Sequence, residues 1–351
     1  MWAIISYGYI TNINIGKNKY GELGNPALKK DLIVDKPILV EFFQKNNLKV
    51  EKVVCDSNHT LVLTKGGRVF SFGNGKYSRF YALSFLFAKT LALGHESNDI
   101  VTVPKMIKKF SGLKIKDIST NKHSALAVDD NNKLYVWGRG EFGVNGMGNS
   151  DSIQTPTENP IMTKIIESLG NPKIKKLVSC SDFSSVLLDN GDVYSFGNND
   201  QGIMGLENNL GVDMTESISF PQPMFRPSMK YNDKDIKVID LDLGEVYSIL
   251  KVENENHETA IFWGGRKLAV KPELIKYDFM EDKPVCIGAC DRGVAFTTES
   301  NKLVNLNQFL NITAKDPETG LNIVDIGEQF GPGLVTSIGG RYADRFLMIE
   351  E

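Results

Sequence analysis

Short apolar runs alternate with clusters of Gly, Asn and Asp along most of the chain. In one stretch, Val50–Cys55 and His59–Leu63 are followed by the polar turn Thr64–Arg68 and then by Phe70–Gly73. Runs of this length, bounded by turn residues, are typical of β-strands rather than helices. Gly, Asn and Asp also tolerate the positive φ values of tight hairpin turns. The pattern therefore predicts antiparallel strands joined by hairpins.

The same arrangement recurs along the chain. Five segments end in an aromatic residue followed by glycine, and these glycines lie 59 to 67 residues apart. They are Gly8, Gly73, Gly138, Gly197 and Gly264, with Trp137 and Trp263 before two of them. His59 and His123 begin the second strand of their units, whereas Phe183 and Tyr247 stand at that place in the next two. We interpret these as structural repeat positions, because a period near 60 residues with about four strands per unit predicts the blades of a β-propeller.

The last unit is incomplete. Val335–Gly340 and Arg345–Ile349 form a strand pair with no third strand after it, and the segment Met1–Gly8 would supply that strand. We therefore predict one all-β domain over residues 1–351, a β-propeller whose ring is closed by the N-terminal strand. This reading counts six blades of four strands and leaves a seventh open.

The amino-acid composition argues against some classes of function. The 40 Lys and Arg and 43 Asp and Glu give a net charge of −3, which argues against nucleic acid as the main partner. No apolar run is long enough to span a bilayer, and the start of the chain resembles neither a secretory signal nor a transit peptide. We read Cys55, Cys180, Cys286 and Cys290 as buried small apolar side chains in a reducing compartment. An intracellular protein is expected.

Glycine is abundant, with 32 residues, while only four Cys and four His are present. Gly138–Gly143 matches a dinucleotide-binding GxGxxG, but here it is the turn of the repeat and not part of a strand–helix unit. Asp56, Ser57 and His59 are neighbours in one turn, whereas a catalytic triad is assembled from separated segments. We expect no catalytic, cofactor-binding or metal-binding residues, no cofactor and no enzymatic activity. A hydrolase or metal enzyme on a propeller remains the minor alternative.

The repeat resembles the regulator-of-chromosome-condensation repeat family. Asn121–Ala127 and Lys133–Gly143 match the first two parts of the family signature closely, Lys17–Asn25 matches the third part, and Asn198–Gly205 matches it less well. The resemblance implies a β-propeller, typically of seven blades, from which the count of six departs. The family histidine survives only as His59 and His123, at a position usually read as structural.

The family's functions are diverse. One member is the exchange factor for the small GTPase Ran and binds nucleosomes, and others act at cilia, with ubiquitin ligases or as subunits of large assemblies. The resemblance and the missing catalytic motifs predict a non-enzymatic protein–protein interaction module, a scaffold subunit or adaptor in a larger complex. The alternative is an exchange factor or regulator of a small GTPase. The expected location is cytoplasmic or on a cytoskeletal or ciliary assembly, with mitochondrion and nucleus left open.

An apolar insertion over residues 78–90 interrupts the second unit and suits a short helix. It either covers its own blade or projects as a partner-binding surface. The candidate interface residues are Phe80, Tyr81, Leu83, Phe85, Leu86 and Phe87. Two further candidates are the long Pro-containing loop Glu207–Asp235 and the segment Asn145–Leu169, with a short helix at Ile161–Leu169. The sequence does not identify the partner or the oligomeric state.

Overall fold

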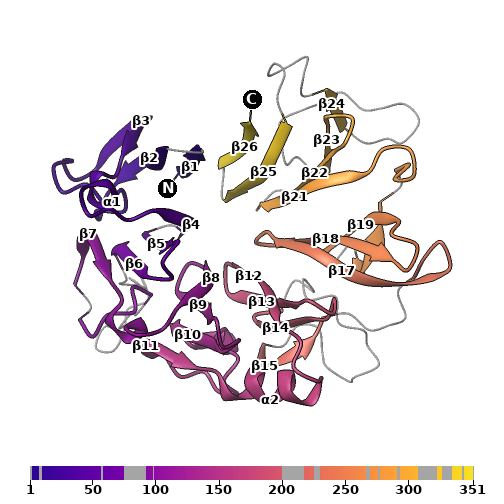
Figure 1. Ribbon diagram of the computed structural model, residues 1–351, viewed down its shortest axis with the longest axis horizontal. Coiled ribbons are helices and arrows are strands. Elements are labelled where there is room, and N and C mark those ends of the chain that lie inside the picture. Colours follow the sequence, from indigo (N-terminus) through magenta and orange to yellow (C-terminus); the bar gives the residue numbers. More distant parts are fainter. Residues whose placement is uncertain are drawn as a thin grey trace, which may run out of the picture. The chain divides into compact units, whose positions relative to one another are not determined.

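The structure of the protein is a computed structural model, and it is built almost entirely of antiparallel β-sheets (Figure 1). It describes all residues except 1, 8–9, 57, 75–91, 98, 200–216, 225–229, 266–268, 276, 291–292, 307–321, 326–333, 342–343 and 351. The chain divides into two compact units. The N-terminal unit comprises residues 1–184, 196–198 and 218–221, and the C-terminal unit comprises the remainder.

The N-terminal unit holds three sheets and part of a fourth. The first contains β1 (Trp2–Tyr7), β2 (Ile10–Asn18) and β3 (Leu32–Leu39), followed by helix α1 (Glu41–Lys45). The second contains β4 (Val50–Asp56), β5 (His59–Thr64), β6 (Val69–Gly73) and β7 (Val101–Met106), followed by the 3₁₀ turn η1 (Lys108–Phe110). The third contains β8 (Ile115–Thr120), β9 (Ser124–Asp129), β10 (Leu134–Gly138) and β11 (Ile153–Glu158), with the 3₁₀ turn η2 (Glu141–Gly143) before β11 and helix α2 (Pro160–Ser168) after it.

The fourth sheet contributes residues to both units, and the others belong to the C-terminal unit. The fourth contains β12 (Ile174–Cys180), β13 (Phe183–Leu188), β14 (Val193–Gly197) and β15 (Ile218–Pro223). The fifth contains β16 (Lys230–Tyr231), β17 (Lys234–Leu243), β18 (Tyr247–Asn254), β19 (Thr259–Gly265) and β20 (Ala269–Leu274). The last two contain β21 (Pro284–Cys290), β22 (Gly293–Thr298), β23 (Lys302–Leu306) and β24 (Asn322–Asp325), and then β25 (Leu334–Arg341) and β26 (Asp344–Glu350).

Five of the sheets in the described part of the chain have the four strands that the repeat predicts, and β16 adds a fifth strand to one of them. The N-terminal strand β1 is the edge strand of the first sheet, where it pairs with β2, while β25 and β26 form a separate two-stranded sheet. The three-stranded and two-stranded sheets are thus the ones left incomplete at the two ends of the chain. Closure of the ring by β1 stays a prediction.

Aromatic and aliphatic side chains fill the space between sheets within the N-terminal unit. Alternate residues of β5 point to opposite faces of its sheet, so Leu61 and Leu63 join one buried cluster and Val62 joins another. The first cluster also includes Trp137 of β10, whose ring meets the edge of Phe110 at a centroid distance of 5.6 Å. Both faces of β5 are therefore covered, and all six of its residues are buried.

A proline recurs in the outermost strand of the sheets. Strands β7, β11, β15 and β20 carry Pro104, Pro156, Pro221 and Pro272 at their fourth position, and β3 carries Pro37. In β3, β7, β11 and β20 the proline lies within an irregularity of the pairing with the inner neighbour. Proline donates no hydrogen bond to a ladder, so it is tolerated at edges and bulges, where it also discourages pairing with another chain. A proline in a short apolar run thus marks the outermost strand of these sheets.

The strand register corrects three of the predicted repeat positions, His123, Gly264 and Trp263. Gly73 pairs with His59 of β5 and with Val101 of β7. The corresponding glycine of the third sheet, Gly138, pairs with Ser124 of β9 rather than with His123. His59 is therefore equivalent to Ser124, and His123 stands one residue earlier. A one-residue slip matters because neighbouring strand residues face opposite sides of the sheet.

A similar slip affects the fifth sheet. There the glycine opposite the start of β18 and β20 is Gly265, which pairs with Tyr247 and Ala269, while Gly264 pairs with Ser248. Trp263 therefore occupies the place of Ser71 in β6, not the place of Trp137 in β10. The remaining predicted position, Gly8, lies outside the described residues.

Candidate partner interface

The predicted apolar insertion, residues 78–90 with its six candidate interface side chains, lies outside the described residues. The nearest described residues on either side of it are Asn74 and Ala92, and both are anchored. Before it, the backbone N–H of Asn74 donates to the carbonyl of Asn58 at 2.7 Å. After it, the indole N–H of Trp137 donates to the carbonyl of Ala92 at 2.9 Å, and the Ser71 hydroxyl donates to the carbonyl of Leu93 at 2.7 Å. Both ends of this connection are thus fixed to sheets of the N-terminal unit.

Part of the segment predicted as a long loop, residues 207–235, forms strands. Its described part includes β15, β16 and the first residues of β17. Two of the three prolines that suggested a loop, Pro221 and Pro223, lie in β15, and Pro227 lies outside the described residues. Strand β15 is the outermost strand of its sheet, where proline, which has no N–H to donate, is tolerated. The interpretation of this whole segment as a binding loop is therefore too broad.

The histidines of the repeat are buried in contacts between strands. The Nε2 atom of His59 lies 2.7 Å from the hydroxyl of Thr120, which belongs to the neighbouring sheet. His123 precedes β9, where the Asn121 side chain accepts hydrogen bonds from the backbone N–H groups of His123 and Ser124. These contacts join strands and sheets, and they leave neither ring open to solvent.

A Ser–His pair occurs in the N-terminal unit, but it is buried. The Nε2 atom of His95 lies 2.9 Å from the Ser71 hydroxyl, which donates to a backbone carbonyl. Burial, assisted by the nearby Lys105, lowers the pKa of His95 to about 4. The hydroxyl of Ser71 is completely buried, so a substrate cannot reach it. The pair ties the connection that ends at His95 to strand β6.

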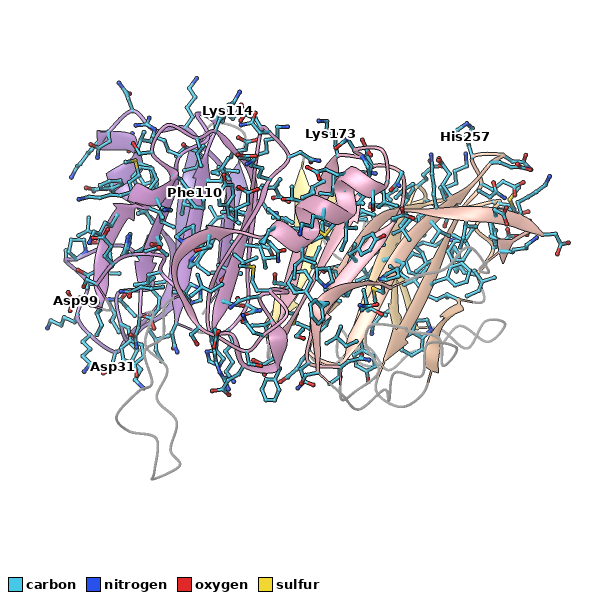
Figure 2. The ribbon with its side chains drawn as sticks, turned by 90° about the horizontal axis from the view of Figure 1, so that it is seen from below. Asp31, Asp99, Phe110, Lys114, Lys173 and His257 are labelled. Atoms are coloured by element: carbon cyan, nitrogen blue, oxygen red, sulfur yellow. The ribbon has the colours of Figure 1, made fainter. Side chains whose placement is uncertain are left out.

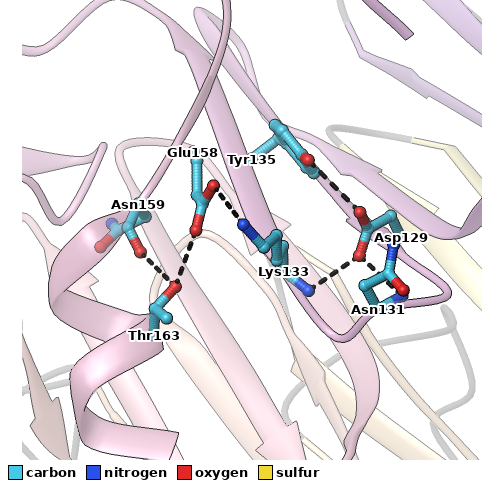
Figure 3. A network of polar contacts seen from close by, with 7 residues as sticks. All are labelled: Asp129, Asn131, Lys133, Tyr135, Glu158, Asn159 and Thr163. Atoms are coloured by element: carbon cyan, nitrogen blue, oxygen red, sulfur yellow. Dashed lines mark hydrogen bonds and ion pairs between the residues drawn. The ribbon is translucent and has the colours of Figure 1, made fainter. Parts of the chain in front are cut away.

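A polar network fixes the segment from Asn145 to Leu169 (Figure 3). Asn159 caps helix α2 by accepting from the backbone N–H groups of Ile161 and Met162, as helix N-caps do. Lys133 pairs with Glu158 at 2.9 Å, and Asp129 closes the hairpin turn by accepting from the backbone N–H of Lys133 at 2.9 Å. The helix predicted at 161–169 is present as α2, and its amphipathic face buries Met162 and Ile166.

Burial, with Asp129 beside it, raises the pKa of Tyr135 to about 12. The Tyr135 hydroxyl donates to that carboxylate at 3.3 Å, so the ring stays protonated in the physiological range. This network serves the packing of the third sheet.

The most distinctive exposed feature of the N-terminal unit is a row of cations along the edge formed by the hairpin turns. Lys49, Lys114 and Lys173 each precede the first strand of their sheet, with the same spacing as Gly73, Gly138 and Gly197. Figure 2 shows Lys114 and Lys173 at one edge of the unit, with Asp31 and Asp99 at the opposite edge. We call Lys49, Lys65, Arg68, Lys108, Lys109 and Lys114, all exposed, the basic edge.

Backbone contacts hold the basic edge together. The N–H of Lys65 donates to the carbonyl of Lys49 at 2.8 Å, and the N–H of Ile115 donates to the carbonyl of Gly67 at 3.0 Å. Gly67 thus brings the hairpin turn of the second sheet against Lys114 of the third. The 3₁₀ turn η1 is attached beside them, because the N–H of Ile107 donates to the carbonyl of Val69. The sequence reasoning missed this surface, although the repeated Lys before each first strand was its signal.

In the described ranges, no three His, Cys, Asp or Glu side chains are grouped so that they could hold a metal ion. The same ranges contain no helix with the length and apolar character of a membrane span.

Comparison with known proteins defines the class of protein. The chain shares the fold of Prp20p from Saccharomyces cerevisiae with a TM-score of 0.66, at 17% sequence identity and with 94% of this chain and 77% of the other covered. It is an all-β propeller protein built of four-stranded sheets, as the repeat predicts.

Within that class, part of the chain is similar to the regulator of chromosome condensation (RCC1) repeat. The RCC1 repeat models match residues 14–63 and 50–79, and the fold is an RCC1-like β-propeller. The human E3 ubiquitin-protein ligase HERC2 is 26% identical over 261 residues, which cover 72% of this chain but 5% of that protein. The X-linked retinitis pigmentosa GTPase regulator of Canis lupus familiaris is 28% identical over 170 residues, covering 48% of this chain and 15% of that protein. The chain therefore spans only a small part of these relatives.

Proposed function

We propose that the protein is a non-enzymatic protein–protein interaction module that works as a subunit or adaptor in a larger intracellular assembly. One contrast within the N-terminal unit carries this proposal. The side chains suited to chemistry, His59, His95 and Ser71, are buried in hydrogen bonds that join strands. The cations of the basic edge, by comparison, are exposed at the surface, where a partner protein can contact them.

RCC1-like propellers are found among proteins that bind other proteins. The Prp20p structure is described together with its binding properties to Gsp1p and histones. Likeness of fold alone does not select a partner, because one fold serves many functions. It does support a rigid protein-binding surface as the general role.

The test is affinity purification of the tagged protein at its native level, after mild cross-linking, followed by size-exclusion chromatography of the eluate. We expect the protein to elute with partners, well above its monomer mass of 39.0 kDa. A clean monomer without any cross-linked partner would remove the basis of the proposal.

The second candidate is a regulator of a small GTPase, and the observation in its favour is the similarity to a GTPase regulator. The measurement is release of a labelled guanine nucleotide from a panel of small GTPases, with and without the protein. Accelerated release would favour this candidate over a purely structural adaptor. No acceleration across the panel would count against it.

A further inference from the structure

The basic edge concentrates positive charge on a protein whose net charge is −3. In the described part of the chain, no carboxylate lies within 4.0 Å of the charged groups of its six members. Some other lysines of the same unit are paired, as Lys45 is with Glu41 and Lys133 with Glu158. The nearest exposed carboxylate along the chain is Glu51, two residues after Lys49, and the exposed Asp130 donates its backbone N–H to the carbonyl of Lys114. The edge therefore keeps a positive excess that its own neighbours do not neutralise.

The six cations are held in one place by rigid elements. They lie on the turn between β5 and β6, on the entries to β4 and β8, and on η1. Each entry is hydrogen-bonded through its backbone to the turn, and Ile107, which precedes η1, is hydrogen-bonded to Val69 at the start of β6. The turn between β5 and β6 is itself closed, since Thr64 and Arg68 exchange hydrogen bonds through the backbone and the threonine hydroxyl. A surface of this kind can bind a partner without ordering its own backbone first, which reduces the entropic cost of association.

We propose that the basic edge is a docking surface for an acidic protein segment rich in Asp and Glu. This inference rests on the proposed function and specifies its partner by chemistry. Five of the six cations are lysines, which act as point charges and attract a negatively charged segment without requiring a bidentate geometry. The overall negative charge also opposes the approach of a long polyanion such as nucleic acid. A short acidic segment is attracted by the positive charge of the basic edge and is too short to reach much of the negative charge on the rest of the protein.

The experiment measures fluorescence anisotropy of a labelled twenty-residue peptide of alternating Glu, Asp, Ser and Gly, with a Ser–Gly peptide of equal length as the neutral probe. The test variant is Lys65→Glu with Lys114→Glu. The matched control is Lys29→Glu with Lys30→Glu, because both lysines are exposed and lie next to Asp31 at the opposite edge (Figure 2). The two variants change the net charge equally. Circular dichroism and thermal melting check that both keep the fold.

We expect the test variant to weaken binding of the acidic peptide at least about tenfold, and the control to weaken it less than about twofold. Binding of the unsubstituted protein should also weaken as salt is added. Equal losses in both variants would mean that only the overall charge matters, and the proposal would fail. It would also fail if the neutral peptide bound as tightly as the acidic one. A twenty-base-pair DNA duplex forms the third arm, and preference for the duplex would replace the acidic segment by nucleic acid.

The same variant separates this inference from the proposed function. If Lys65→Glu with Lys114→Glu retains its native partners in the affinity purification, the protein still acts in an assembly, but the basic edge is not its docking surface. If the unsubstituted protein binds the acidic peptide yet captures no partner, the proposed function fails on its own measurement.

Discussion

Replacement of Gly138 by alanine should destabilise the protein strongly, and more than replacement of Gly112 or Gly66. Gly138 has φ +106°, a conformation that side-chain-bearing residues rarely adopt. A Cβ atom there would lie 2.4 Å from the carbonyl oxygen of His123 and 2.5 Å from the Cα of Ser124. Both obstacles are backbone atoms of the adjoining strand entry, so they cannot rotate away. Relief requires β10 to move from β9, which stretches the 2.9 Å hydrogen bond from the N–H of Arg139 to His123.

Two control glycines separate the cost of backbone strain at positive φ from the cost of the steric contact made by the added Cβ. Gly112 has φ +84° but nothing within 4 Å of an added Cβ, so alanine there tests backbone strain alone. Gly66 has no positive φ, and its nearest contact would be the Thr64 hydroxyl at 4.0 Å. We expect about 3–5 kcal/mol of destabilisation for Gly138→Ala and about 1–2 kcal/mol for Gly112→Ala. Gly66→Ala should change stability by less than about 1 kcal/mol, in the stabilising direction.

The assay is equilibrium unfolding in urea, followed by tryptophan fluorescence and by circular dichroism. Trp137 adjoins Gly138 and is fully buried, so its emission should report the separation of these strands directly. Coincident unfolding curves from the two probes would show that the protein unfolds in a single transition. If Gly138→Ala lowered the free energy of unfolding no more than Gly112→Ala, the contact between the added Cβ and the backbone of His123 and Ser124 would not be destabilising, and the reasoning would be refuted. Gly73→Ala and Gly197→Ala should repeat the larger loss, because their added Cβ atoms meet backbone oxygens at the same 2.4 Å.

Three further predictions concern the insertion, the N-terminal strand and acid stability. Deletion of Phe80–Thr90 should leave thermal unfolding nearly unchanged while weakening co-purification of a partner, and an unfolded product would show that the segment belongs to the core. Removal of Met1–Gly8 should lower the melting temperature of the whole protein, because it deletes β1 and exposes β2; unchanged melting would contradict the predicted closure. His95 has a folded pKa of about 4, below its ordinary value of 6.5, so stability should be constant above pH 6.5 and fall as pH drops towards 4, by at most about 3 kcal/mol. His95→Asn should flatten that pH dependence in urea titrations, and an unchanged slope would assign it to other groups.

Most of the strands could be predicted from the sequence because their causes are local. Val50–Cys55 and His59–Leu63 were predicted and are β4 and β5, each within one residue of the observed bounds. The edge strand β15 was predicted as part of a long Pro-containing loop, because prolines are loop signals when the position of a strand in its sheet is unknown. An edge strand tolerates the lost donor, and only the sheet order shows which strand is at the edge.

The candidate surface was less predictable than the fold. The apolar residues of the insertion at 78–90 are contiguous in the sequence and therefore predicted a candidate interface. The basic edge, in contrast, consists of residues far apart in the sequence, such as Lys49, Lys65 and Lys114. Single lysines at strand entries carry no signal by themselves, since most exposed lysines have no partner role. Their common spacing with the repeat glycines was visible, but that they share an edge depends on how the sheets stack.

The sequence by itself determined the repeat, the all-β class and the aromatic–glycine ends of the third strands, since turn residues and apolar periodicity act over a few neighbours. It could not determine register. His59 and His123 look alike along the chain, yet pairing makes His59 equivalent to Ser124 and places Trp263 where Ser71 stands in β6. Register is decided by how a whole strand fits its partner and the core beside it, and a shift of one residue moves every side chain to the opposite face. For that reason only the tertiary structure assigned the buried contacts of the histidines and brought the lysines of separate blades together on one edge.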